Sequence, residues 1–250
     1  MRRKFKASEI NAEISPYFDR PGTSDDSSNN GSPAKKRARP NKYGGMSEED
    51  VMKLLLPDRV AENLDILFIG INPGLTSAYK GHHYAGPNNH FWPCLYDSGL
   101  VPEKLTFRDD EKCPAYGIGL TNIVERTTRG SSDLSRKEIK DGVDALIVKV
   151  KRLKPLVACF NGKGIYEIFS KSKCEIGRQT KCIPGTNVVV YVMPSSSGRT
   201  MTYPRASDKL KFFTELKSLR DEAKLKTLSA DADKPKTDNT DTREKKTLET

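Results

Sequence analysis

LDILFIGINPG, residues 64–74, is an almost continuous apolar run that ends abruptly in Asn-Pro-Gly. A strand covered on both faces is apolar throughout, whereas a half-exposed strand alternates between apolar and polar residues. We therefore predict a buried strand over residues 64–71, with Asn72 at the point where the strand ends. An asparagine side chain is neither acid, base nor nucleophile at neutral pH, so this position asks for a chemical explanation.

Further strands and helices alternate downstream of this run. The predicted strands are GIGLTNIV (117–124), LVACF (156–160) and VVVYVM (188–193). Four helices are predicted. The first follows a Ser-x-x-Asp cap at Ser47, and the second follows a capping box of Ser135 with Glu138. The third spans GKGIYEIFSK (162–171), and the last has an apolar face formed by Leu210, Phe213, Leu216 and Leu219. This alternation predicts an α/β fold, a three-layer α/β/α sandwich with a mostly parallel central sheet.

The two ends of the chain differ in composition from the middle. Residues 1–42 hold few large apolar side chains, and residues 227–250 alternate Asp, Lys and Thr. Such segments bury too little apolar surface to offset the entropy lost on ordering. We predict a disordered basic N-terminal arm over 1–42, one folded domain over 47–222 and a disordered charged tail over 227–250.

The charge balance points to an anionic partner. The formal net charge is +10, which favours nucleic acid or an acidic lipid surface. No stretch approaches the ~18 apolar residues of a membrane span, and the N-terminus lacks the apolar region of a signal peptide. We therefore expect a soluble, intracellular protein with no membrane partner. The basic cluster at residues 35–39 suggests a nuclear import signal or a segment that grips phosphates, and we expect a nuclear location.

Cysteine and histidine spacing argues against a metal centre. Five cysteines with no CxxC pair predict free thiols, and neither a disulfide framework nor a structural zinc site. The spacing of the histidines matches no metal motif, so we predict no metal at His82, His83, His90 and Cys94.

Four polar stretches fall at or near the carboxyl ends of predicted strands. They are Asn72-Pro73-Gly74, Thr121-Asn122, Asn161-Gly162-Lys163 and residues 194–199, PSSSGR. In open parallel α/β sheets the ligand crevice lies at that edge. Each stretch alone could be a turn, but together they predict one site.

The same stretches resemble a known family. GINPG (70–74), AYKGHHY (78–84), NHFW (89–92), VERTT (124–128), FNGK (160–163) and YVMPSSS (191–197) occur in this order. With these motifs, residues 47–222 resemble the thymine DNA glycosylases, the eukaryotic branch of the mismatch-specific uracil glycosylases. The resemblance implies a uracil-DNA glycosylase-like fold with no metal or organic cofactor.

The resemblance also implies an activity and a substrate. Members hydrolyse the N-glycosidic bond of thymine or uracil opposite guanine, and of 5-formylcytosine and 5-carboxylcytosine. We thus expect a monofunctional, monomeric enzyme that binds double-stranded DNA with G·T or G·U mispairs or oxidised methylcytosine. It would start base excision repair and active DNA demethylation, and hand its product to abasic-site repair enzymes.

Glycosidic hydrolysis explains an amide at position 72. The reaction passes through an oxocarbenium-like sugar, so the attacking water needs orientation more than deprotonation. The amide oxygen of Asn72 can hold that water, whereas a carboxylate would also stabilise the cation and give a faster enzyme. Slow chemistry favours selectivity for mispaired bases. The resemblance places His83 near the sugar or the leaving base, with a structural hydrogen bond inside its loop as the alternative.

The remaining roles also rest on the resemblance. It implies that Arg199 fills the space left when the target nucleotide flips out of the duplex. The base pocket would comprise Ile71, Tyr84, Asn89 and Asn122. Asn122 would read the base edge, and Asn89 would accommodate a 5-carboxyl group. Phosphate contacts are expected from Ser195, Ser197, Gly198, Lys163, Thr128 and Arg129.

Two other functions deserve comparison. A nucleotide-binding Rossmann enzyme would need G-x-G-x-x-G after the first strand, which GINPGLTSAYKG lacks. A catalytically weak coregulator that binds mismatched or modified DNA would use the same pocket and the same arginine, so the sequence leaves that alternative open.

Overall fold

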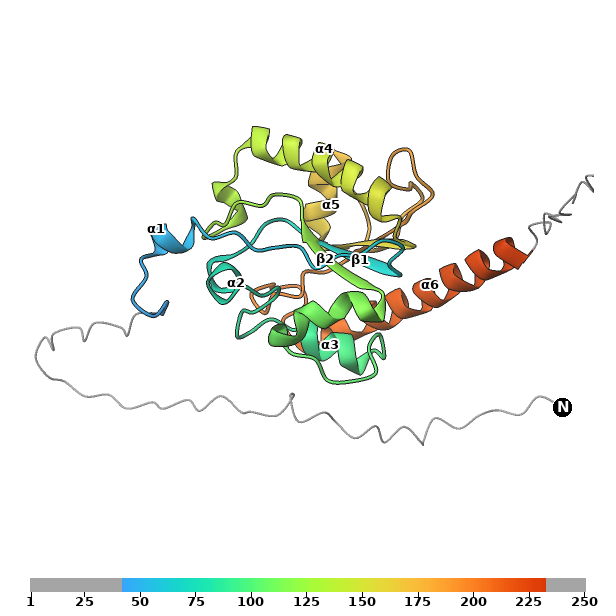
Figure 1. Ribbon diagram of the computed structural model, residues 1–250, viewed down its shortest axis with the longest axis horizontal. Coiled ribbons are helices and arrows are strands. Elements are labelled where there is room, and N and C mark those ends of the chain that lie inside the picture. The colour runs from blue at the N-terminus through green and yellow to red at the C-terminus, as the bar shows by residue number, and fades with distance from the viewer. Residues whose placement is uncertain (1–41, 233–250) are drawn as a thin grey trace, which may run out of the picture.

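A five-stranded sheet forms the centre of the part of the chain that the computed structural model describes, residues 42–232 (Figure 1). The strands are β1 (Ile66–Gly70), β2 (Ile118–Asn122), β3 (Val157–Asn161), β4 (Gly177–Arg178) and β5 (Val189–Met193), in the order β2-β1-β3-β5-β4. All pairings are parallel except that of the edge strand β4 with β5. The predicted mostly parallel sheet is confirmed.

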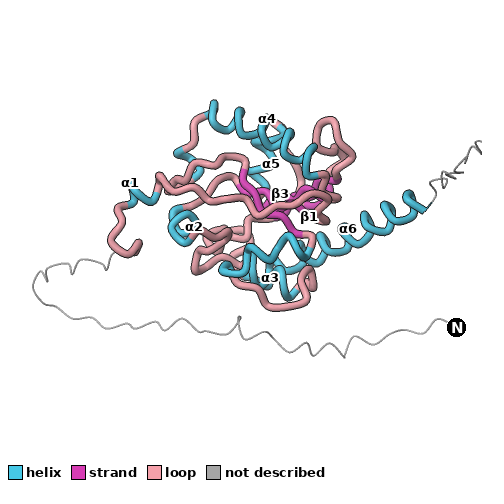
Figure 2. The backbone as a smooth tube through the Cα atoms, in the orientation of Figure 1, coloured by secondary structure: helices cyan, strands magenta, loops and turns pink. Residues whose placement is uncertain are grey.

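Helices cover both faces of this sheet (Figure 2). They are α1 (Glu48–Val51), α2 (Leu75–Lys80), α3 (Phe91–Asp97), α4 (Arg136–Leu153), α5 (Lys163–Ser170) and α6 (Ala206–Ala232), with 3-10 helices η1 (Phe107–Tyr116) and η2 (Ser131–Asp133). On one face Phe68 of β1 packs with Phe91 of α3 and Phe213 of α6. Its neighbours Leu67 and Ile69 join the cluster that includes α4 and α5 on the other face. The three-layer α/β/α sandwich is confirmed.

The capping signals in the sequence begin the helices that they predict. The Ser47 hydroxyl accepts from Asp50 N at 3.1 Å at the start of α1. The Ser135 hydroxyl accepts from Glu138 N at 3.2 Å, and the Glu138 carboxylate accepts from Ser135 N at 2.8 Å, which opens α4. These local bonds satisfy amide groups that have no partner inside the helix.

Several short elements were not predicted from the sequence. The segments of α2, α3, η1 and β4 had no predicted structure. LTSAYK has no apolar period, and FWPCLYD carries a proline in its first turn, which is tolerated there but is no strong helix signal. Tertiary packing stabilises α3, because Phe91, Trp92 and Leu95 are buried against the sheet and α6.

Two predicted boundaries differ from the structure. Helix α6 continues to Ala232, so residues 227–232 are helical and the predicted disorder from 227 onward is wrong for them. Tyr43 is buried against Val51 and Ala78, so ordered structure begins before Ser47. Residues 1–41 and 233–250 lie outside the described residues. The predictions for them, including the basic cluster 35–39, stay predictions.

Two further findings concern composition. Within residues 42–232, no helix combines the length and the apolar character that a bilayer crossing requires. All five cysteines carry free thiols, as predicted, and only Cys182 among them is exposed.

Candidate active site

A cavity of about 680 Å³ opens at the carboxyl edge of the sheet. This volume is in the range of pockets that hold small organic ligands. The four polar stretches all contribute to its wall, through Asn72 after β1, Asn122 of β2, Asn161 of β3 and residues 195–199 after β5. One side of the cavity is lined by residues of the N-terminal segment, namely Lys42, Tyr43 and Glu48.

Nearly all of the predicted site residues line this cavity. They are Ile71, Asn72, His83, Tyr84, Asn89, Asn122, Thr128, Arg129, Ser195, Ser197, Gly198 and Arg199. Lys163 is the exception: it opens α5 outside the cavity wall and lies 3.9 Å from Glu175. The structure therefore gives no support to a phosphate contact by Lys163 as part of this site.

The amide of Asn72 is held in one orientation. Its Nδ2 donates to Arg126 O at 2.8 Å, to Thr128 Oγ1 at 2.7 Å and, more weakly, to Pro73 O at 3.3 Å. Carbonyl oxygens only accept, so the nitrogen must face them. No residue of 42–232 is bonded to Oδ1, which is left as a hydrogen-bond acceptor in the cavity wall. This is the geometry needed to hold a water molecule by its hydrogen.

Thr128 has a different place from the one predicted. Its side chain is 1% exposed, so it cannot reach a phosphate in this conformation. Its hydroxyl donates to Gly130 O at 2.8 Å and therefore accepts from Asn72 Nδ2. The predicted DNA contact is corrected to a positioning role, in which Thr128 sets the direction of the Asn72 amide.

Thr128→Val is expected to lower the single-turnover rate of base release about tenfold, since it removes one hydrogen bond that orients Asn72. Thr127→Val is the matched control. The Thr127 side chain is equally buried and its hydroxyl donates to Leu54 O at 2.7 Å, away from Asn72. Both variants should lose similar thermal stability. Equal rates in the two variants would contradict the positioning role.

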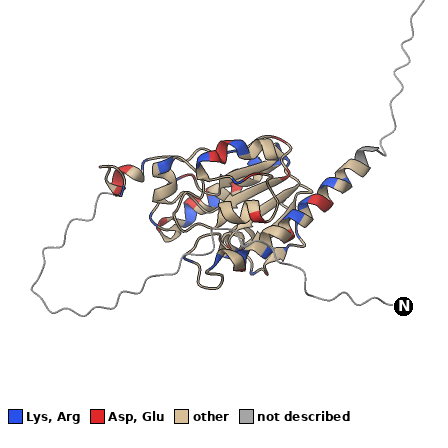
Figure 3. Ribbon diagram, turned by 90° about the horizontal axis from the view of Figure 1, so that it is seen from below, with Lys and Arg blue, Asp and Glu red and all other residues tan. Residues whose placement is uncertain are grey.

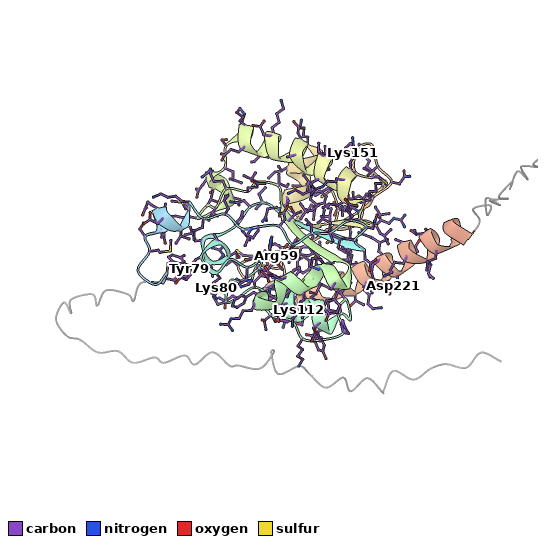
Figure 4. All side chains as sticks on the ribbon, in the orientation of Figure 1. Arg59, Tyr79, Lys80, Lys112, Lys151 and Asp221 are labelled. Atoms are coloured by element: carbon purple, nitrogen blue, oxygen red, sulfur yellow. The ribbon has the colours of Figure 1, made fainter. Side chains whose placement is uncertain are left out.

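His83 belongs to a buried polar network that extends from the cavity wall into the protein. Its Nε2 lies 3.0 Å from Pro57 O, and its main-chain N donates to Asp110 Oδ2 at 2.9 Å. Asp110 is fully buried and also contacts Arg59 Nε at 3.2 Å and His82 Nδ1 at 2.9 Å. Arg59 reaches from there to Gly81 O at the end of α2 (Figure 4).

This network corrects the predicted catalytic role of His83. A carbonyl only accepts, so Nε2 carries a hydrogen that is committed to Pro57 O. Burial lowers the pKa of His83, so the ring is neutral at physiological pH. The geometry supports the alternative, a structural hydrogen bond, and together with Asp110 it holds the loop that presents Tyr84 to the cavity.

The remaining base-pocket residues offer a flat ring and amide edges. The Tyr84 ring stacks on the Phe91 ring, with centroids 4.0 Å apart. The backbone of Tyr84 has a left-handed φ of 53°. Asn122 lies directly over Gly70, where an added Cβ would come within 2.4 Å of Asn122 Oδ1. Asn89 Oδ1 accepts from Phe91 N at 3.0 Å, which leaves its NH₂ group as a donor. Such groups suit a flat heterocycle with hydrogen-bonding edges.

The segment after β5, residues 195–200, is called the insertion loop below. Asn161 Nδ2 donates to Ser196 Oγ at 2.9 Å, and Asn161 Oδ1 accepts from Ser196 N at 2.8 Å. Gly198 N donates to Asn88 O at 2.8 Å, and a Cβ on Gly198 would lie 2.3 Å from that oxygen, so only glycine fits. Asn161 belongs to one of the four stretches predicted to form the site, but no role was predicted for it, although its position at the end of β3 matches those of Asn72 and Asn122.

Two arginines at the cavity differ in their surroundings. Arg199 is exposed on the insertion loop and forms no ion pair within residues 42–232. Arg129 is paired with Glu48 and, at 2.9 Å, with Glu49, both on the acidic helix α1 (Figure 3). A phosphate contact by Arg129 would therefore need an exchange of partners. Of the two, Arg199 is the one whose guanidinium is not held by a carboxylate of the described residues.

No group of three or more His, Cys, Asp or Glu side chains in residues 42–232 is arranged to hold a metal ion. The side chains considered from the sequence have other partners. His82 contacts Asp110, His83 contacts Pro57 O, His90 contacts Lys209, and Cys94 Sγ donates to Ala206 O at 3.5 Å.

Comparison with known families agrees with this arrangement. The family model described as the Uracil DNA glycosylase superfamily matches residues 57–217, well over half of the chain and every strand of the sheet. The chain belongs to this superfamily. The resemblance noted from the motifs is thereby confirmed at the level of the superfamily.

The chain is also similar to individual proteins. A G/U mismatch-specific uracil DNA glycosylase of Schizosaccharomyces pombe is 38% identical over 159 residues, which are 59% of this chain and 48% of that protein. The chain thus spans about half the length of this curated relative. A solution NMR structure from Methanosarcina acetivorans, provisionally assigned as a uracil DNA glycosylase, covers 66% of this chain and 98% of its own, with 24% identity and a TM-score of 0.47.

Proposed function

We propose that this member of the superfamily hydrolyses the N-glycosidic bond of uracil opposite guanine in duplex DNA and so starts base excision repair. The observation that carries the proposal is the orientation of Asn72, a cavity-lining residue whose NH₂ group is fixed by Arg126 O and Thr128, while its Oδ1 has no partner among residues 42–232. The G/U mismatch specificity for which the fission-yeast relative is named supports the choice of substrate.

The chemistry follows from these groups. The nucleotide flips out of the duplex at a cost of a few kcal/mol, which is least for a mispair. Its base enters beside Tyr84 and Asn122, the C–N bond breaks, and the base departs as an anion. Asn72 Oδ1 accepts a hydrogen bond from the water that attacks the sugar cation, and the proton that this water loses on forming the C–O bond neutralises the departed base anion, directly or through solvent. Because position 72 carries an amide and not a carboxylate, it stabilises the sugar cation less, and the rate depends strongly on how well the base leaves.

The same pocket suits further substrates, and we include thymine opposite guanine, 5-formylcytosine and 5-carboxylcytosine in the proposal. The NH₂ group of Asn89, which has no partner among residues 42–232, can donate a hydrogen bond to a 5-carboxylate, whereas uracil has no 5-substituent to accept it. Removal of oxidised cytosines would also place the protein in active DNA demethylation. We further propose that it acts as a monomer in the nucleus and passes abasic sites to later repair enzymes.

A single-turnover assay tests this function. Purified full-length protein in excess is mixed with duplexes containing G·U, A·U, G·T or G·5-carboxylcytosine, and abasic sites are revealed by alkaline strand cleavage. We expect cleavage of G·U at a rate at least about tenfold above A·U, because a mispaired base costs less to flip. Tight binding of G·U with no abasic product would instead favour the non-catalytic DNA-binding coregulator.

A further inference from the structure

Helix α6 carries a buried cation that the proposed mechanism does not use. Lys209 is 1% exposed and stands among the largest fully buried side chains of the described residues. It occupies the apolar face of α6, one and two turns before the core residues Phe213 and Leu216. A buried ammonium group is costly unless polar partners compensate its lost hydration. Burial lowers the pKa of Lys209, in keeping with this position.

The partners of this ammonium group belong to the insertion loop and to the start of α3. Lys209 Nζ donates to Ser197 O at 2.6 Å and lies 3.2 Å from His90 Nδ1. His90 in turn donates its main-chain N–H to Ser196 O at 2.9 Å. No carboxylate in the described part of the chain forms an ion pair with Lys209, although Asp208 precedes it in the helix. The short contact to a loop carbonyl is therefore its main compensation.

These contacts make Lys209 one of several anchors of the insertion loop, beside the bond from His90 N–H to Ser196 O. Asn161 holds Ser196 from β3, and Asn88 O holds Gly198 from the loop before α3. Lys209 bonds to Ser197, which lies between these two residues and two positions before Arg199. An apolar side chain of the same length would fill this space without a desolvation cost, so packing alone does not account for a charged group here.

We propose that Lys209 is a positioning residue that stiffens the insertion loop, so that Arg199 can enter the duplex without the loop recoiling. This inference rests on the proposed function of the loop. Inserting a side chain between stacked bases requires a rigid support, because the unstacking cost would otherwise displace the loop. The positive charge beneath the loop also attracts the flanking phosphates, and burial reduces its screening by salt.

Lys209→Met tests the proposal, with Lys226→Met as the control. Methionine matches the length of lysine without donor or charge. Lys226 lies on the same helix and pairs with exposed Glu222, far along the chain from the loop. The first readout is amide hydrogen exchange in protein without DNA. Ser196 N, Gly198 N and Arg199 N all donate within the loop region, and we expect about tenfold faster exchange there in Lys209→Met only.

The second readout is single-turnover cleavage of two substrates. On G·U we expect about a tenfold loss in Lys209→Met, whereas uracil opposite an abasic site, which flips without unpairing, should lose less than about twofold. In an Arg199→Ala background the Lys209→Met change should cost little, since both act through one loop. The melting temperature should be unchanged or higher, because a buried charge is removed.

Several outcomes would overturn the inference. Equal losses on the two substrates together with a lower melting temperature would mark Lys209 as a general structural residue. Additive losses with Arg199→Ala, or unchanged exchange in the insertion loop, would show that Lys209 does not act through that loop. If the wild-type protein fails to cleave G·U at all, the proposed function fails, and the hydrogen-exchange comparison still decides whether Lys209 anchors the loop.

Discussion

Replacing Asn72 with alanine is expected to lower the single-turnover rate of uracil release from a G·U duplex by about 10³-fold, or about 4 kcal/mol in activation free energy. The amide acts on the attacking water and on the sugar cation, both of which exist only during the reaction. Affinity for the G·U duplex should therefore change less than about threefold. Rates are measured with enzyme in excess, and affinity by fluorescence anisotropy.

Asn187→Ala is the matched control for this prediction, since Asn187 is an exposed asparagine that is not part of the cavity wall. It should keep the wild-type rate. Alanine at position 72 leaves Arg126 O without its side-chain donor, so a melting curve is needed to show that the fold is intact. A folded Asn72→Ala protein that cleaves at a near-normal rate would show that another group orients the water.

Arg199→Ala is expected to lower cleavage of a G·U duplex about a hundredfold, close to ~3 kcal/mol, which is comparable with the cost of flipping a stacked nucleotide. The guanidinium is exposed and unpaired within residues 42–232, so it can enter the stack and donate hydrogen bonds to the unpaired guanine. The loss should shrink to a few-fold for uracil opposite an abasic site, where nothing is left to fill or to pair. Single-turnover rates on both duplexes check this.

A general loss of positive charge would look different. Arg152→Ala removes an exposed arginine from the end of α4, outside the cavity wall, and should leave both substrates near the wild-type rate. If Arg199→Ala reduced cleavage of both substrates equally, with a shallower dependence of binding on salt, Arg199 would be a phosphate contact that does not enter the stack.

The surroundings of Asn72 bear on the selectivity expected under the proposed function. Asn72 is fixed by main-chain carbonyls and Thr128, a set of acceptors that would repel a carboxylate in the same place. A simple exchange of Asn72 for aspartate would thus place a charge against Arg126 O. Under the proposed function, the selectivity of this pocket would rest on an amide that its neighbours require.

Local patterns were enough to predict much of the fold. The apolar run of residues 64–71, the Ser135–Glu138 capping box and the alternation of strands with helices each depend on neighbours in the chain, and all appear in the structure. The convergence of Asn72 and Asn122 could also be predicted, because the carboxyl ends of parallel strands meet at one edge. Short elements such as α3 escaped, since their stability comes from packing rather than from their own sequence.

The hydrogen-bond partners of the polar side chains could not be predicted from the sequence. Thr128 was expected to hold a phosphate and instead orients Asn72; His83 was expected near the sugar and is bonded to Pro57 O. No role was predicted for Lys209, although a lysine on the apolar face of α6 is unusual. A hydroxyl, an imidazole or an ammonium group can bond to many partners, and local spacing does not select one. The selection is made when distant segments pack together and every buried polar group must find a partner among those that the fold brings within reach.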